Sequence, residues 1–239
     1  MLKIQSSLAS FLTGPLSLFL GAQMALAAHE ISLPRPAEEG KVSVEEAIKG
    51  RRTIRHFESK VLTLSQLGQV LWAGQGETKK AGLCRRAAPS GGALYPLDLY
   101  AVVGQDGVQG LQSGIYRYLP ESHSLREVSP GDKRQSMAKA AWGQAWMADA
   151  PAILVVTAQY RRITQKYGER GIRYALIEVG HVGENICLQA VALGLGAGLV
   201  GAFGDEKLRA LLECPAGEDP LYLLPIGYQR HEPEESENR

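Results

Sequence analysis

A chain of 239 residues, with 45% hydrophobic and 21% charged residues, has the composition of a globular protein and is long enough for one large domain. Its formal net charge of +1 provides no basic field, which argues against a nucleic-acid-binding protein. No change in composition along the chain indicates a second domain.

Residues 1–27 have the features of a secretory signal peptide. Lys3 is the only charge in this stretch, residues 8–20 form an apolar run, and Ala25-Leu26-Ala27 resembles a cleavage site. We therefore expect cleavage after Ala27 and export, with the periplasm as the destination. An uncleaved membrane anchor and a cytoplasmic protein are the alternatives.

Residues 28–41 form a Pro-rich lead-in without periodicity. Ser43 with Glu46, and Thr63 with Gln66, have the spacing of capping boxes and predict helices over 44–50 and 64–73. The first helix is expected to end at Gly50 and the second at Gly74, and residues 75–87 are expected to form a loop.

The middle of the chain mixes strands with helices. The apolar or alternating patterns predict strands over 97–103, 114–119, 124–128 and 152–159. The second and third of these read as a hairpin, and the fourth, nearly all apolar, reads as a central strand. Asp132 is expected to cap a helix over 133–147 that carries Trp142 and Trp146.

The C-terminal part contains the longest predicted helix, residues 170–193. Its expected apolar face consists of Ile172, Leu176, Val179, Val182, Ile186, Ala190 and Leu193. A small helix over 205–212, a strand over 220–228 and a disordered acidic tail over 231–239 follow. Because regular βαβ repeats are absent from this pattern, we expect an α+β fold with a mostly antiparallel sheet flanked by helices.

The cysteines and the motifs exclude several chemistries. Cys84, Cys187 and Cys214 are odd in number and widely spaced, so they predict thiols rather than a disulfide framework. Glu178, His181 and Asn185 share a face of the long helix, but a second ligand motif is missing and no metal site is expected. Gly196, Gly198 and Gly201 follow a helix rather than a strand, which argues against a dinucleotide-binding fold.

Three segments could bind or transform a small molecule. Arg51, Arg52, Thr53 and Arg55 offer guanidinium groups and a hydroxyl to a phosphate, or form a solvated loop. Pro89, Ser90, Gly91, Gly92 and Ala93 form a stiff loop of small residues that exposes backbone N–H groups to a ligand, or an ordinary turn. Lys166 and Tyr167 form a proton-transfer pair, or a surface lysine beside a packed tyrosine.

In this order along the chain, four segments resemble the nitroreductase superfamily of FMN oxidoreductases: RRTIRHF (51–57), APSGGALYPLDLY (88–100), RYALIEVGHVGENICLQAVALGLG (173–196), and LVGAF (199–203) with LLPIGYQR (223–230). The closer resemblance is to its SagB/ThcOx-type branch, the azoline dehydrogenases. It covers residues 42–230 as one FMN-binding domain. The chain departs from the family pattern at Thr53, where a serine is usual, and at Glu184, where a glutamine is common.

The resemblance implies a homodimeric flavoprotein with FMN in pockets at the subunit interface. It assigns Arg51, Arg52, Thr53, Arg55 and Arg230 to the FMN phosphate and ribityl chain, and Pro89, Ser90, Gly91, Gly92, Ala93 and Gly201 to the flavin ring. Lys166 and Tyr167 match a pair that removes a proton. The expected substrate is a small molecule or a modified peptide, with NAD(P)H as a candidate electron donor. A non-catalytic flavin-binding or scaffold protein is the alternative.

Overall fold

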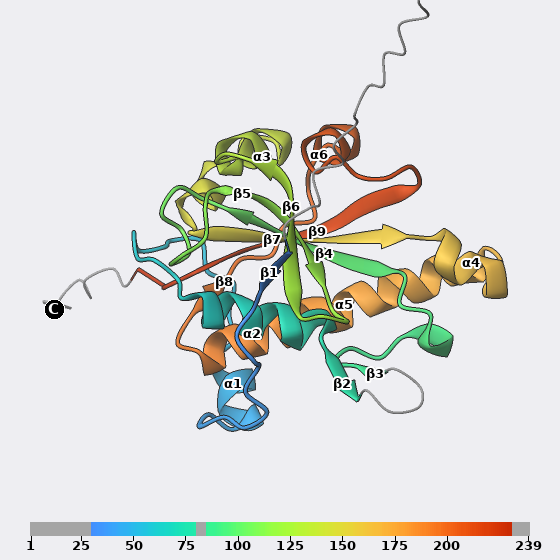
Figure 1. Cartoon of the computed structure of the whole chain (residues 1–239), viewed down its shortest axis with the longest axis horizontal. Helices are drawn as coiled ribbons and strands as arrows, with labels where there is room; N and C mark the ends of the chain where they lie inside the picture. The colour runs from blue at the N-terminus through green and yellow to red at the C-terminus, as the bar shows by residue number, and fades with distance from the viewer. Residues whose placement is uncertain (1–29, 80–84, 231–239) are drawn as a thin grey trace, which may run out of the picture.

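The computed structural model describes residues 30–79 and 85–230 (Figure 1). The predicted signal peptide and acidic tail lie outside these residues and stay predictions, and Cys84 also lies outside them. Cys187 is buried and Cys214 is half-buried, and both are free thiols, as expected. Within the described ranges, no helix combines the length and apolarity needed to cross a bilayer.

Among the described residues, seven strands form one sheet in the order β1-β6-β5-β4-β7-β9-β8, and every pairing between them is antiparallel. Their bounds are β1 Glu30–Ser32, β4 Leu97–Val103, β5 Gly114–Leu119, β6 Ser124–Pro130, β7 Ala152–Gln159, β8 Gly196–Ala197 and β9 Glu218–Gly227. A separate pair, β2 Glu77–Lys79 and β3 Arg85–Arg86, lies beside this sheet. The predicted α+β class and mostly antiparallel sheet are therefore confirmed.

Helices cover both faces of the sheet, so the central strand β7 is buried on both sides. In Figure 1, α1 (Val44–Gly50), α2 (Leu64–Gln75) and α5 (Arg170–Ala192) lie on one face, and α3 (Arg134–Ala140) and α6 (Asp205–Leu211) on the other. Adjacent residues of β7 alternate between the faces: Leu154 packs in the core under α2 and α5, and Val155 in the core under α3 and α6.

The first two helices begin where the capping boxes predict. Ser43 Oγ accepts from Glu46 N at 3.1 Å, and Glu46 Oε2 accepts from Ser43 N at 2.9 Å. Thr63 and Gln66 make the same reciprocal pair at the start of α2. These contacts are local, which is why the sequence spacing was sufficient to predict them.

The predicted end of the second helix is wrong. Gly74 lies inside α2, which continues to Gln75. A Cβ atom at Gly74 would lie 3.0 Å from Leu99 Cδ1 and 3.1 Å from Ile186 Cδ1. Glycine therefore allows α2 to approach β4 and α5 closely at this position, rather than ending the helix.

The predicted helix over 133–147 is also interrupted. α3 ends at Ala140, and Trp142 and Gly143 follow with positive φ angles of 56° and 81°. A separate 3-10 turn covers Ala145–Asp149. The Asp132 carboxylate accepts from the backbone N of Arg134 and of Gln105, so it ties the start of α3 to a loop rather than capping a long helix.

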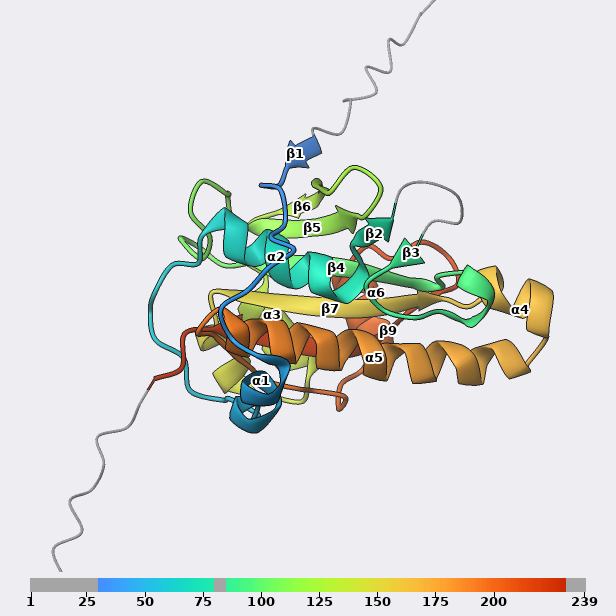
Figure 2. The ribbon, with the colours of Figure 1, turned by 90° about the horizontal axis from the view of Figure 1, so that it is seen from below.

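Two segments expected to be irregular contain regular structure, and one short helix was not predicted. The lead-in contributes β1, which pairs with β6, and residues 75–87 contain β2 and β3. Lys166 and Tyr167 lie in α4 (Arg161–Tyr167), a short helix that joins β7 to α5 (Figure 2). Each of these elements is too short for its sequence period to be recognised.

The predicted apolar face of α5 is buried over a shorter length than expected, because burial of its residues begins only after Leu176. Val179, Val182, Ile186 and Ala190 are buried against the sheet and α2, whereas Ile172 and Leu176 are exposed. The N-terminal part of α5 projects beyond the sheet toward α4, as Figure 2 shows. Helical spacing identifies the residues that can share a face but not what covers that face.

Candidate functional site

The loop between β3 and β4 adopts an unusual backbone conformation. Gly92, Ala93 and Tyr95 all have positive φ angles, of 65°, 54° and 45°. Ser90 holds this conformation from both of its oxygens: its carbonyl accepts from Ala93 N at 3.1 Å, and its Oγ accepts from Tyr95 N at 2.9 Å. Positive φ is costly for residues with a Cβ, so two such residues in one turn indicate a loop fixed by its surroundings.

Lys166 and Tyr167 of α4 meet this loop at Gly92. A Cβ atom on Gly92 would lie 2.7 Å from the Tyr167 hydroxyl oxygen and 3.0 Å from Lys166 Nζ. The Tyr167 ring also packs edge-on against Tyr174 of α5, with the ring centroids 5.2 Å apart. The two proton-bearing groups therefore lie against a loop position that has no side chain.

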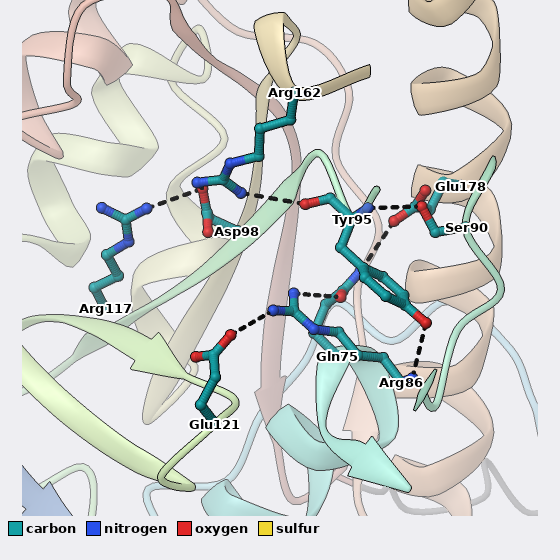
Figure 3. A network of polar contacts seen from close by, with 9 residues as sticks. All are labelled: Gln75, Arg86, Ser90, Tyr95, Asp98, Arg117, Glu121, Arg162 and Glu178. Carbon is teal, nitrogen blue, oxygen red and sulfur yellow. Dashed lines mark hydrogen bonds and ion pairs between the residues drawn. The ribbon is translucent and has the colours of Figure 1, made fainter. Parts of the chain in front are cut away.

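A shared ion pair anchors α4 to the sheet. Asp98 of β4 forms ion pairs with Arg162 at 2.8 Å and with Arg117 of β5 at 3.0 Å, and its side chain is 12% exposed (Figure 3). Arg162 also donates to the carbonyl of Tyr95 at 3.2 Å, so it joins the loop to α4. Because Arg162 precedes Lys166 by four residues, it fixes the same face of α4 that presents Lys166 to the loop.

A second polar chain lies under the loop. Arg86 Nη1 donates to Gln75 Oε1 at 3.2 Å, and Gln75 Nε2 lies 3.4 Å from Glu178 Oε1 (Figure 3). Glu178 is buried within α5, and burial raises its pKa to about 7 against smaller opposing effects of Ser90, Gln75 and Arg86. A carboxyl that changes charge near neutral pH thus sits beside the loop.

These polar residues line a pocket of about 470 Å³ beside the loop. Its lining includes Arg86, Tyr95, Asp98, Arg117 and Arg162, several of which are paired with carboxylates. The pocket therefore offers donors and acceptors together, one helical turn from Lys166.

The arginine-rich segment forms the second half of the candidate site. Thr53 forms an isolated parallel β-bridge with Ala197 of β8, and Ile54 N donates to the carbonyl of Ala197 at 3.0 Å. Arg230 N donates to the carbonyl of His56 at 2.9 Å, which places the C-terminal segment along the same strip of backbone. The structure therefore brings together the predicted phosphate contacts from residues 51–55 and 230.

Three of the four arginines of this half are available to bind an anion. Arg51 pairs with Glu184 of α5 at 3.5 Å, whereas Arg52, Arg55 and Arg230 are exposed and form no ion pair with any residue in the described ranges. Arg55 lies over the Trp146 ring, 5.9 Å from its centroid. Unpaired guanidinium groups gathered from two segments fit a phosphate.

Gly201 lies in the turn that follows this strip. It is exposed, and a Cβ atom there would meet nothing within 4 Å. The open backbone at this position leaves room for a flat ring, although the structure itself does not require glycine there.

Helix α5 connects the two halves. The arginine-rich segment contacts it at Glu184, and the loop lies near Glu178, six residues or about 9 Å along the axis. Asn185, on the same face, donates to the carbonyls of Ala73 and Ala87, while His181 is exposed. Two of the three polar residues predicted on this face thus bind neighbouring elements, and no group of metal ligands occurs in the described part of the chain.

The sequence interpretation missed the residues that support the loop. Asp98 was detectable as the one charge within an otherwise apolar strand, which is a signal for a buried ion pair. Arg86 and Gln75 gave no such signal, because their partners lie on other elements. Only the fold shows that they connect α2, β3 and α5.

Comparison with known proteins identifies the family. Residues 48–228 match the nitroreductase family. The chain belongs to the nitroreductase family. This nitroreductase-family protein is 40% identical over 198 residues to MJ1384 of Methanocaldococcus jannaschii, a protein named as a nitroreductase; the match covers 83% of this chain and 96% of that one.

Two further relatives extend the comparison. A crystal structure from Ralstonia eutropha JMP134, also named as a nitroreductase, matches with a TM-score of 0.74 and 27% identity over 85% of this chain and 90% of that chain. The Escherichia coli microcin B17-processing protein McbC is 32% identical over 117 residues, which are 48% of this chain and 43% of that protein. Membership of the family confirms the predicted relationship and supports an oxidoreductase function.

Replacing Gly92 with alanine tests the close contact with α4. Both Gly92 and Gly110 have positive φ, but a Cβ at Gly110 would meet nothing within 4 Å. We expect Gly110→Ala to lower the free energy of unfolding by about 1 kcal/mol, and Gly92→Ala to lower it by about 1 kcal/mol more because Tyr167 and Lys166 must move. Urea denaturation measures both, and equal losses would contradict the contact.

Replacing Asp98 tests the anchor of α4. Asp98→Asn leaves Arg117 and Arg162 without their shared carboxylate, and we expect a loss of about 2 kcal/mol of unfolding free energy, allowing for partial exposure of both arginines. The control is Glu30→Gln, which breaks a more exposed ion pair with Arg126 and should lower the unfolding free energy much less than Asp98→Asn does. Losses of similar size in the two variants would show that Asp98 does not anchor α4.

Proposed function

We propose that this nitroreductase-family protein is an FMN-dependent oxidoreductase of the SagB/ThcOx type. The observation that carries the proposal is the meeting of two sequence-distant segments: Lys166 and Tyr167 lie over the loop at Gly92. A proton-transfer pair placed on a ligand-binding loop is an arrangement suited to removing or delivering a proton during hydride transfer.

The residues present fit the cofactor. The exposed Arg52, Arg55 and Arg230 suit a phosphate, and the open backbone at Gly201 suits a flat ring. Arg51, Arg52, Thr53, Arg55 and Arg230 would hold the phosphate and ribityl chain, and Pro89, Ser90, Gly91, Gly92, Ala93 and Gly201 would lie along the ring. When bound, FMN supplies hydride transfer.

The chain's own residues accept the proton during oxidation or supply it during reduction. Oxidation of a C–N or C–C bond removes one hydride and one proton, and reduction adds both. The Tyr167 hydroxyl and the Lys166 ammonium are the proton-bearing groups at the loop, with Lys166 Nζ 5.3 Å from the Tyr167 ring centroid. Arg162, held by Asp98, fixes the helix that carries them.

Two directions of reaction are compatible with this geometry: reduction of a nitro compound or quinone with NAD(P)H as donor, and oxidation of a ring or amine. The resemblance of the sequence to azoline dehydrogenases favours the second direction, and similarity to the microcin B17-processing protein supports a peptide-derived substrate. The pocket of about 470 Å³ beside the loop offers such a substrate both charged and aromatic contacts.

We further propose a homodimer. Ile172, Leu176 and Ile177 are exposed apolar residues in the N-terminal half of α5, and their exposed fractions are 40%, 51% and 53%. Val44 and Ile48 of α1 are also exposed, and α1 packs against α5. Exposed apolar residues gathered on two packed helices are typical of an interface rather than of a solvated surface.

Removal of the proton-transfer pair tests the catalytic proposal. Purified protein should be yellow and bind FMN, as measured by visible absorbance. Lys166→Ala and Tyr167→Phe should retain FMN but lower the rate of flavin reduction or reoxidation by about 100-fold. Stopped-flow absorbance measures this rate. The control, Arg161→Ala on the exposed face of α4, should leave the rate unchanged. FMN binding with full activity in both variants would favour a different proton donor, and FMN binding without any turnover would favour the non-catalytic alternative.

Placing a charge among the exposed apolar residues of α5 tests the proposed dimer. Leu176→Asp should convert a dimer to a monomer in sedimentation velocity experiments, because a buried carboxylate at an interface lacks a partner. Val61→Asp, at an exposed apolar residue elsewhere, should leave the dimer intact. A wild-type protein that sediments as a monomer would refute the homodimer.

A further inference from the structure

A buried carboxyl lies beside the Ser90 hydroxyl of the loop. The Glu178 side chain is 1% exposed, and its Oε1 faces Gln75 Nε2 at 3.4 Å. Figure 3 shows the carboxyl beside the Ser90 hydroxyl, and Ser90 is one of the groups that lower the pKa of Glu178 against the effect of burial. Oε2 is buried and forms no hydrogen bond within the described residues.

The orientation of Gln75 determines which oxygen of Glu178 can carry a proton. Arg86 donates to Gln75 Oε1, so the amide nitrogen of Gln75 must face Glu178. Oε1 of Glu178 is therefore an acceptor. When the carboxyl is protonated, the proton resides on Oε2, and Ser90 is the neighbouring group able to accept it.

The hydrogen-bonding capacity of Ser90 makes the charge of Glu178 consequential. A serine hydroxyl has one proton and two lone pairs, and Tyr95 N already donates to one lone pair at 2.9 Å. An ionised Glu178 can only accept hydrogen bonds, so the Ser90 hydroxyl directs its single proton toward the carboxylate. A neutral Glu178 can instead donate to the second lone pair of Ser90, which leaves the Ser90 proton available to a ligand in the loop.

We propose that Glu178 is a positioning residue: its protonation frees the Ser90 hydroxyl to donate to FMN, and its ionisation withdraws that donor. The inference rests on the proposed FMN site at this loop. Glu178 itself does not touch the cofactor but acts through Ser90.

Both charge states are accessible in the neutral range, because burial raises the pKa of Glu178 to about 7. The charged and titratable groups around it are Arg86 of β3, which acts through Gln75, and Lys166 and Tyr167 of α4, which lie across the loop at Gly92. On α5 itself, Tyr174 is one turn before Glu178 and packs on Tyr167. Replacing only Glu178 leaves all of these in place.

The dissociation constant for FMN as a function of pH tests the proposal. In the wild type it should rise by about five-fold between about pH 6 and pH 8, the effect of one lost hydrogen bond. Glu178→Gln should bind tightly throughout, because the glutamine amide donates permanently to Ser90 and cannot ionise. Ser90→Ala should bind at the weaker level throughout. The FMN phosphate also titrates in this range, so the quantity compared at each pH is the ratio of the wild-type to the Glu178→Gln dissociation constant. The same measurement with riboflavin, which lacks the phosphate, removes this contribution.

A second measurement reports whether Glu178 titrates in the cofactor-free protein. A carboxyl whose pKa is raised in the folded state loses its stabilising protonated form as pH rises through the folded pKa. The unfolding free energy of the wild type should therefore fall relative to Glu178→Gln between about pH 5 and pH 8, as measured by urea denaturation.

The outcomes are separable from those of the proposed function. A protein that binds no FMN at any pH refutes the proposed function. A protein that binds FMN, but whose ratio of dissociation constants is the same at both ends of the pH range, refutes the role of Glu178 alone. If Glu178→Gln does not fold, Ser90→Ala gives the same test, because retention of the wild-type pH dependence in that variant would overturn the proposal.

Discussion

The packing of helix α5 against the sheet is the constraint on which both halves of the candidate site depend. Val182 and Ile186 bury one face of this helix in the core with β4 and β7, and Gly183 allows it to approach Tyr222 of β9, since a Cβ there would lie 3.1 Å from the tyrosine ring. Because a helix has a fixed rise per residue, it sets the distance between the elements that contact it. The arginine-rich segment contacts it at Glu184 and the Ser90 loop lies near Glu178, so the spacing between the two halves follows from helical geometry.

The loop itself is held in a costly conformation by polar contacts from several elements. Ala93 and Tyr95 adopt positive φ angles, and Ser90 and Arg162 supply hydrogen bonds that compensate. The same Arg162 joins α4 to Asp98 in the sheet. The conformation of the loop and the position of Lys166 and Tyr167 therefore depend on the same contacts. A change that releases α4 also removes a hydrogen bond that supports the loop. This coupling is typical of preorganised sites, where the geometry is fixed before a ligand arrives.

The buried carboxyl gives this preorganised loop a dependence on pH. Most elements of the site present fixed charges, such as the guanidinium groups of Arg52 and Arg55. Glu178 differs because burial places its ionisation near neutrality, and because its neighbour Ser90 has a single proton to donate. Within a family that shares one fold, differences in such supporting groups can adjust cofactor binding without altering the residues that contact the cofactor.

Local contacts and periodicity allowed much of this protein to be predicted from its sequence: the capping boxes at Ser43 and Thr63, the antiparallel sheet, the helix over 170–193 and the family. The segments that form the candidate site were also recognised in the sequence. Tertiary structure alone decided that Gly74 lies within a helix, that Ile172 and Leu176 are exposed, and that Lys166 meets the loop at Gly92. The physical reason is that a capping box or a helical face is set by residues three or four apart, whereas burial, close approach and ion pairing depend on which distant element folds against a position.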